Sequence, residues 1–205
     1  MLPTDLLSWT AFSLLLVTST GLLLSRDWRW SIGLLAAQYL GMFWLVTLHW
    51  PFGLASVKLV TGWMASATLG ITRLNLAEQG NPEESAWPQG HLFRLFAAAL
   101  TVVLVAAATP QVEAMIPGVS RPVIAGGLLL ACMGLLHLGI TAEPLRIILG
   151  LLTVMSGFEI LYAIVETSIL LAGLLSIVNL GLALAGAYLM TAAPSHDAEK
   201  TERLE

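Results

Sequence analysis

Two ionisable residues interrupt long apolar stretches of the sequence and are its first candidates for chemistry. Lys58 and Glu159 are each surrounded by apolar neighbours on both sides. Charged side chains are costly in the hydrocarbon of a membrane, and those that occur there often mark ion or proton pathways or pair with one another. A nearby carboxylate keeps a lysine charged. The sequence therefore predicts either an intramembrane ion pair or a step in a proton path at Lys58 and Glu159.

An alternative interpretation keeps these two residues apart. The long Lys58 side chain could extend to surface water while its apolar stem stays in the membrane, and neighbouring hydroxyl groups could hold Glu159. Two amides, Gln38 and Asn179, also lie near the middle of apolar stretches, where an amide finds its partner on an adjacent helix. We therefore expect Gln38 and Asn179 to hold helices together.

His137 lies near the end of its apolar stretch, close to the expected membrane surface. Its titration near neutral pH could serve proton uptake, but an interfacial histidine without such a role is the preferred interpretation. The lone Cys132 cannot hold an iron–sulfur cluster, and the sequence contains no spaced histidine pair for haem and no glycine-rich phosphate loop. We predict no catalytic residue, no cofactor and no metal site.

The composition indicates the environment in which these residues lie. Of the 205 residues, 57% are hydrophobic and only 11% are charged, whereas soluble domains contain about 25% charged residues. With a single cysteine, the chain cannot be a disulfide scaffold, and its composition excludes a disordered chain, a nucleic-acid binder and an ordinary soluble enzyme. The partner that the composition indicates is the lipid bilayer.

The number of membrane crossings follows from the lengths of the apolar segments. A spanning helix needs about 20 predominantly apolar residues, because ~30 Å of hydrocarbon is crossed at ~1.5 Å per residue. Seven segments meet this requirement, and Pro51, Pro110 and Pro117 are placed in loops between them. The sequence predicts an all-α polytopic integral membrane protein with seven transmembrane helices at residues 6–25, 31–48, 54–74, 92–109, 123–140, 145–165 and 168–191.

The basic residues predict the orientation. With seven spans, seven lysines and arginines fall on one side, only Arg121 falls on the other, and Lys58 lies within a span. Cytoplasmic loops are enriched in these residues, so we expect a plasma (inner) membrane protein with the N-terminus outside and the C-terminus in the cytoplasm. No basic residue precedes the first apolar segment, which we therefore expect to remain in the mature protein.

A shift of the sequence by 117 residues suggests an internal repeat. It aligns Arg29 with Arg146, Gly33 with Gly150 and Leu34 with Leu151. The expected plan is a three-helix repeat (1–74), a cytoplasmic loop, connecting helix and outer loop (75–122), a second, parallel three-helix repeat (123–191) and a disordered cytoplasmic tail (192–205). Chance matches between apolar helices are the alternative. The acidic loop at 75–91 could contact a peripheral partner or serve as a solvated linker.

The three-helix unit, with a basic turn before an R-x-x-x-G-L-L helix, resembles the K subunit of respiratory complex I and the C subunit of Mrp antiporters. Two such units joined by an extra helix resemble the component E family of hydrogenase-4 and formate hydrogenlyase-type complexes. The segments that carry this resemblance are LLLVTSTGLLLSRDWRWSIGLLAAQYL and HLGITAEPLRIILGLLTVMSGFEILYAIV.

The resemblance implies a membrane-embedded, non-redox subunit that lies beside antiporter-like subunits and supports assembly and proton or sodium translocation. The K subunit carries a glutamate on its second and on its third helix, whereas this chain has Gln38 and no carboxylate in the first repeat, and Glu159 lies about two turns later than its counterpart. This departure favours a lateral supporting subunit over an autonomous channel. A self-contained small-solute or ion transporter and a membrane anchor or assembly protein are the alternatives.

Overall fold

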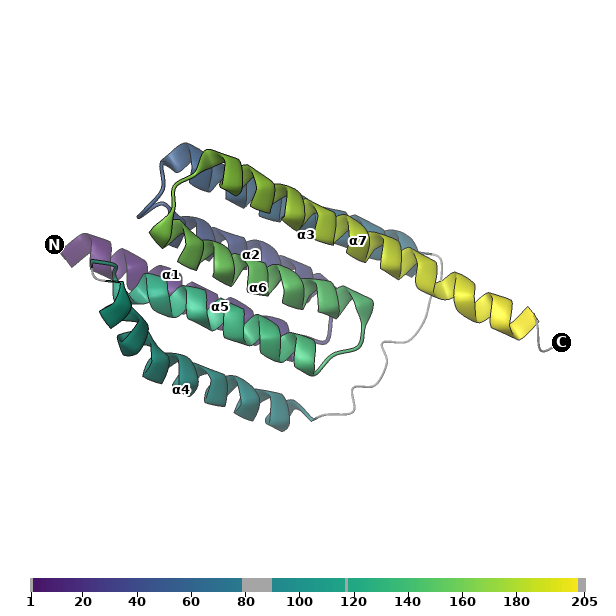
Figure 1. Cartoon of the computed structure of the whole chain (residues 1–205). Coiled ribbons are helices and arrows are strands. Elements are labelled where there is room, and N and C mark those ends of the chain that lie inside the picture. Colours follow the sequence, from purple (N-terminus) through teal and green to yellow (C-terminus); the bar gives the residue numbers. More distant parts are fainter. Residues whose placement is uncertain (1, 79–89, 117, 203–205) are drawn as a thin grey trace.

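The computed structural model describes residues 2–78, 90–116 and 118–202, and this part of the chain contains helices and no β-strand. The predicted all-α class is confirmed. Seven helices run back and forth along a common direction (Figure 1). They are α1 (Leu2–Leu24), α2 (Trp28–Val46), α3 (Phe52–Glu78), α4 (His91–Met115), α5 (Arg121–Gly139), α6 (Pro144–Val165) and α7 (Ile169–Glu202).

Local sequence explains where several helices begin. The Asp27 carboxylate accepts a hydrogen bond from the Arg29 backbone N–H at 2.9 Å and so caps the first turn of α2. Pro122 and Pro144 lie in the first turns of α5 and α6, where a backbone N–H has no partner within the helix. The helix starts are therefore determined by short-range signals.

Six of the helices are long and apolar enough to cross a membrane, and α2 is the one that falls outside this group. With 19 residues, α2 is as long as α5. It carries Arg29, Gln38 and Tyr39, which lower its apolar character, and it packs against α1, α3, α5 and α6. Gln38 and Tyr39 are buried against neighbouring helices, where polar groups can find partners, whereas Trp30 on the same helix is 70% exposed.

Pro110 lies inside α4, so its predicted place in a loop is wrong. The helix continues to Met115 because Pro110 interrupts the hydrogen-bond ladder at a single point, near the end, where few turns depend on it. A proline in a helix bends it. Figure 1 shows the C-terminal part of α4 turning toward α5.

Two other helices extend beyond their predicted ends. α3 continues through residues 75–78, and the rest of the acidic loop, 79–89, lies outside the described residues. α7 continues to Glu202, although the sequence predicts a disordered tail from residue 192. The last helical residues include alanine, glutamate and lysine, which are strong helix formers even where no apolar face directs their packing.

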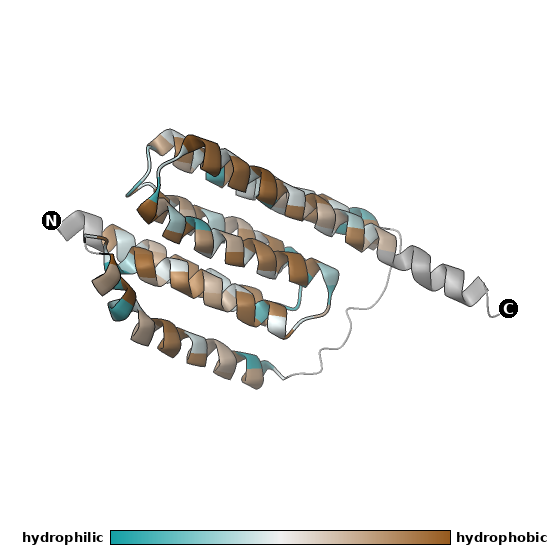
Figure 2. Ribbon diagram, viewed as in Figure 1, coloured by the Kyte–Doolittle hydropathy of each residue, from teal (hydrophilic) through white to brown (hydrophobic). Residues whose placement is uncertain are grey.

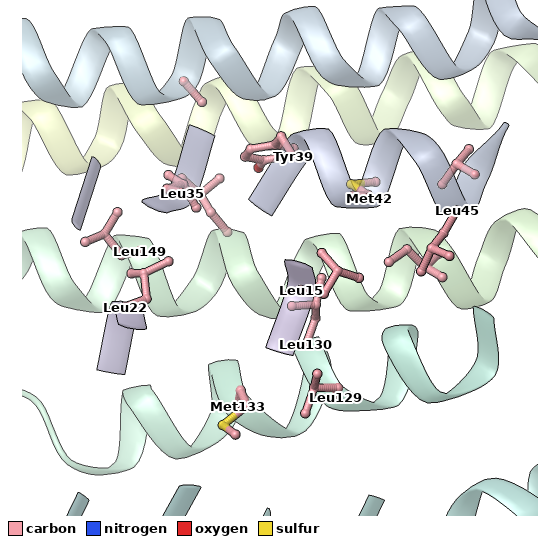
Figure 3. Close-up of a cluster of buried hydrophobic side chains, with 14 of the residues drawn as sticks. Leu15, Leu22, Leu35, Tyr39, Met42, Leu45, Leu129, Leu130, Met133 and Leu149 are labelled. Carbon is pink, nitrogen blue, oxygen red and sulfur yellow. The ribbon is translucent and has the colours of Figure 1, made fainter. Parts of the chain in front are cut away.

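The bundle is layered. α3 lies along α7, α2 contacts α6, α1 packs along α5, and α4 covers the outer side of α1 and α5 (Figure 1). α5 and α6 approach most closely, because Gly134 and Gly150 face each other's backbones and Gly127 faces Gly157. A leucine-rich core fills the space between α1, α2, α5 and α6 (Figure 3).

The outer surface of the bundle is apolar. Large hydrophobic side chains such as Val103 on α4 and Leu170 on α7 are more than half exposed, and brown, apolar residues cover the outside of the helices in Figure 2. An aqueous solvent would disfavour so much exposed apolar surface. The helices therefore indicate a lipid environment, in agreement with the sequence.

The two ends of the bundle differ in charge. The chain termini lie at opposite ends (Figure 1). We call the end that carries Ser25, Arg94 and Arg146 the basic end, and the end formed by the α2–α3 and α6–α7 turns the Trp50 end.

Candidate intramembrane polar site

Lys58 and Glu159 meet in the interior of the bundle. Lys58 Nζ on α3 donates a hydrogen bond to Glu159 Oε1 on α6 at 2.6 Å, and each side chain is only 1% exposed. The structure thus contains the ion pair that the sequence suggests, and the alternative in which Lys58 extends to surface water is wrong. Both groups are buried because α3, α6 and α7 pack around them.

Asn179 completes this cluster from a third helix. Its Nδ2 atom on α7 donates to the same Glu159 Oε1 atom at 3.1 Å, and the Asn179 side chain is fully buried. The expected role of Asn179 in holding helices together is consistent with this bond. We refer to Lys58, Glu159 and Asn179 as the polar triad. It joins the α3–α7 pair to α6.

The polar triad lies near the Trp50 end. Lys58 is six residues from the start of α3, and Glu159 is six residues from the end of α6, so both lie about 9 Å from that end. Trp50 Nε1 donates to the Glu166 backbone carbonyl at 2.9 Å and ties the α2–α3 turn to the α6–α7 turn above the triad. The site is therefore off-centre along the bundle axis.

Some of the oxygens around the triad have no hydrogen-bond partner within the described residues. They are Glu159 Oε2 and Asn179 Oδ1. Buried polar atoms are normally paired, because leaving one unpaired costs about 1–3 kcal/mol. The triad therefore has free hydrogen-bond acceptors that could take a proton or bind a small polar ligand.

Tyr39 is a residue of this site that sequence reasoning missed. Its side chain is fully buried on α2, and it is close enough to Glu159 to interact with that charge. Its ring lies directly over Gly62 of α3, where any Cβ atom would collide with it. The sequence signal was Gly62, four residues after Lys58 and hence on the same helix face, which leaves room for a large neighbour.

Gln38 makes a separate contact nearer the middle of the bundle. Its Nε2 atom donates to Thr153 Oγ1 of α6 at 3.4 Å, and Thr153 in turn donates to the Leu149 carbonyl at 2.8 Å. Gln38 is fully buried. The residue links α2 to α6, as expected of an amide between helices, and it does not join the polar triad.

His137 lies far from the triad, at the basic end. It is 4% exposed, so the expectation of an interfacial side chain is wrong. The last turn of α5 is covered by its neighbours, and His137 lies close enough to Arg94 and Arg146 to interact with their charges. Sequence position near a helix end therefore did not determine exposure here.

Two buried arginines at the basic end hold the last turn of α1 and the connection that follows it. Arg146 donates to the Ser25 and Arg26 carbonyls at 2.7 and 3.1 Å and to Glu143 at 2.7 Å, while Arg94 donates to the Leu23 carbonyl at 3.4 Å. The last carbonyls of a helix lack partners within the helix and carry the negative end of its dipole. Sequence reasoning counted these arginines only as topology signals and missed this role.

The chemistry available to the triad is proton transfer. No group of three or more histidine, cysteine, aspartate or glutamate residues that could hold a metal occurs in the described ranges. Glu159 can take up a proton on its unpaired oxygen, and Lys58 can release one. The arrangement suits a proton-exchanging group or a structural ion pair.

Comparison with known proteins identifies no relative: no protein-family model, no curated protein and no solved structure matches this chain.

Proposed function

We propose that this chain is a seven-span, non-redox membrane subunit of a complex I-related energy-converting complex, similar to component E of hydrogenase-4 and formate hydrogenlyase-type complexes. It supports assembly and proton or sodium translocation beside antiporter-like subunits. The observation that carries this proposal is the polar triad of Lys58, Glu159 and Asn179, an ionised cluster buried in an otherwise apolar bundle. Such clusters in membranes commonly serve ion pathways.

The arrangement of helices supports the two-repeat plan. The shift of 117 residues equates α1 with α5, α2 with α6 and α3 with α7, and the two members of each of these pairs contact each other. Two parallel repeats related by an axis along the membrane normal would place equivalent helices together in this way. In this proposal α2 is the seventh span and the middle helix of the first repeat, packed against α1, α3, α5 and α6.

Orientation in the plasma (inner) membrane follows from the basic end. At this end Arg146 donates to the Arg26 carbonyl and Arg94 donates to the Leu23 carbonyl. Arg73 lies 3.9 Å from Glu143 at the same end. By the positive-inside rule the basic end faces the cytoplasm. The C-terminus is then cytoplasmic and the N-terminus outside.

A role beside partner subunits is supported by the distribution of polar groups. Between Thr153 and Arg146, α6 contributes apolar residues to the core, and Leu149 is fully buried. Because residues 147–152 of α6 are apolar, the chain does not by itself provide a continuous polar route from one end of the bundle to the other. Partner helices against the apolar outer faces of α4 and α7 would complete such a route.

The test begins with purification of the natively expressed, tagged chain in mild detergent, followed by mass spectrometry of co-purifying proteins. We expect antiporter-like membrane subunits together with redox subunits. Recovery of the chain as a stable single species contradicts the proposal and favours a self-contained transporter or a membrane anchor.

A second experiment tests the contribution to ion movement. Glu159→Gln should reduce coupled ion transport by the parent complex without releasing the subunit from it. Ser176→Ala on α7 is the matched control, because its hydroxyl bonds only to the Ala172 carbonyl of its own helix in the described structure. Unchanged coupling in Glu159→Gln would leave the ion pair a structural role only.

A further inference from the structure

Polar groups flank Glu159 on both sides along α6. Toward the basic end, the hydroxyls of Ser156 and Thr153 donate to carbonyls of their own helix, and Gln38 donates to Thr153. Toward the Trp50 end lie Tyr162 and Glu166. Tyr162 follows Glu159 by three residues and so lies about one turn nearer the end of α6, and Glu166 is the extended residue at which the helix ends. Glu166 is exposed, and Tyr162 is close enough to interact with its charge. The hydroxyl oxygen of Tyr162 is closed off from the surface and has no hydrogen-bond partner within the described residues.

Aromatic packing fixes Tyr162 between the triad and the surface. The Trp50 ring meets the Tyr162 ring edge-on, with centroids 6.3 Å apart. The Phe158 ring stacks on the Tyr162 ring, with centroids 6.1 Å apart. Trp50 also holds the Glu166 backbone carbonyl. A phenol hydroxyl can both donate and accept a hydrogen bond, which is the property required of a proton relay.

Beyond Thr153 and Gln38, the opposite direction is closed by leucines. Arg146 lies thirteen residues before Glu159, which corresponds to about 20 Å along the helix. Leu35 and Leu149 are 0% exposed and Leu22 is 2% exposed, and Figure 3 shows these three side chains gathered between α1, α2 and α6. Water and protons cross such a packed apolar layer poorly, because no polar group replaces the hydration that is lost.

From this asymmetry we propose that Glu159 exchanges protons with the aqueous compartment at the Trp50 end and not with that at the basic end, with Tyr162 and Glu166 forming the route. On uptake, a proton from water passes through this route and forms an O–H bond on Glu159 Oε2, and the Lys58–Glu159 ion pair becomes a charged lysine beside a neutral acid. On release, that O–H bond breaks and the proton returns to the same compartment.

The groups that face Glu159 are consistent with this step. Lys58 on α3, Asn179 on α7 and Tyr39 on α2 surround the carboxyl group. α5 presents Gly127 and Ala131 to this part of α6, and the titratable His137 of α5 lies at the other end. No second described carboxylate therefore stands beside Glu159 to take its place as the proton acceptor.

The inference deepens the proposed function by naming the side from which the triad is reached, yet it concerns this chain alone. The test uses the purified full-length chain in proteoliposomes, sorted by a C-terminal affinity tag into the two orientations. Dicyclohexylcarbodiimide, which crosses membranes and reacts with protonated carboxyl groups, is the probe. Peptide mass spectrometry measures its adduct at Glu159 while the pH of each compartment is set separately.

We expect the Glu159 adduct to increase by about tenfold for each unit of acidification at the Trp50 end, as long as the group is mostly ionised. Acidification at the basic end should leave the adduct unchanged. The inference is overturned if the adduct follows the pH at the basic end, follows both compartments equally, or follows neither.

Two variants test the route itself. Tyr162→Phe keeps the aromatic packing and removes the hydroxyl, so the adduct should respond several-fold more slowly to a pH jump at the Trp50 end. Tyr188→Phe is the matched control, because Tyr188 is 71% exposed on α7. Equal response rates in these two variants would exclude Tyr162 from the route. Recovery of the chain without partners would reject the proposed complex and still leave the adduct measurement interpretable.

Discussion

The buried ion pair allows a quantitative test of how the bundle is held together. Replacing Lys58 by methionine removes the ammonium group 2.6 Å from Glu159 Oε1 and leaves the buried carboxylate with the Asn179 amide as its neutral hydrogen-bond donor. Removal of one member of a buried pair typically costs about 3–5 kcal/mol, because the other charge stays buried without compensation. Glu159→Gln leaves the Lys58 ammonium buried without its carboxylate and should lower the unfolding free energy by a similar amount.

The double variant Lys58→Met/Glu159→Gln should be far more stable than the sum of the single effects predicts. Replacing both members of a buried pair is often close to neutral, so the coupling free energy should approach the sum of the two single effects, about 6–10 kcal/mol. The assay is reversible unfolding in mixed detergent micelles, followed by tryptophan fluorescence. If the two single effects add within about 0.5 kcal/mol, the two side chains do not interact and the reasoning is refuted.

An exposed ion pair of similar length provides the control. Arg121 Nε lies 2.5 Å from Glu113 Oε2, and the Arg121 side chain is 63% exposed. Solvent screening limits such a pair to about 0–1 kcal/mol. Arg121→Met should therefore change the unfolding free energy much less than Lys58→Met, which would show that burial rather than distance sets the energy of these pairs.

Three further predictions concern other parts of the bundle. Arg146→Lys should lower the unfolding free energy by about 1–2 kcal/mol, because an ammonium group cannot reach the acceptors that the guanidinium holds, and exposed Arg29→Lys should be neutral in the same assay. Gly157→Ala should destabilise by about 1–3 kcal/mol, since the new Cβ would collide with the Ala131 backbone, whereas Gly33→Ala meets no atom within 4 Å and should be neutral or stabilising. Burial lowers the pKa of His49 in the α2–α3 turn below 6.5, so the unfolded state binds more protons than the folded state near that pH. The unfolding free energy should therefore fall as the pH drops through 6.5. An equal fall of the unfolding free energy in the His49→Gln variant would contradict this assignment.

The fold class and the central pair were accessible from sequence for a simple physical reason. Apolar segments long enough to span a bilayer are easy to recognise, and a charge within them is rare. Lys58 and Glu159 could be placed at similar depth by counting residues from their helix ends. Depth along a helix is fixed by its rise, so a prediction based on depth needs no knowledge of the packing.

Rotation about the helix axis and contact between helices could not be obtained in this way. His137 was expected at the surface because it is near a helix end, yet its side chain points into the bundle. Tyr39 carries no signal of its own in the sequence, because aromatic residues are common in apolar helices; its place near Glu159 depends on the packing of its ring against Gly62. Pro110 was assigned to a loop because a proline usually ends a helix, but a nearly complete helix tolerates one bend.

The off-centre position of the triad constrains how the chain can take part in ion movement. If Glu159 is reached only from the Trp50 end, a proton that arrives there must leave either by the same route or sideways into a neighbouring subunit. The leucine layer of Leu22, Leu35 and Leu149 blocks the direct route to the basic end, where the nearest buried ionisable groups are Arg94, His137 and Arg146. Transport across the whole membrane then requires a second protein whose own polar groups lie beside the triad and continue toward the cytoplasm. This requirement distinguishes a lateral subunit from a self-contained transporter, because in the latter a polar route would have to cross the leucine layer within this chain.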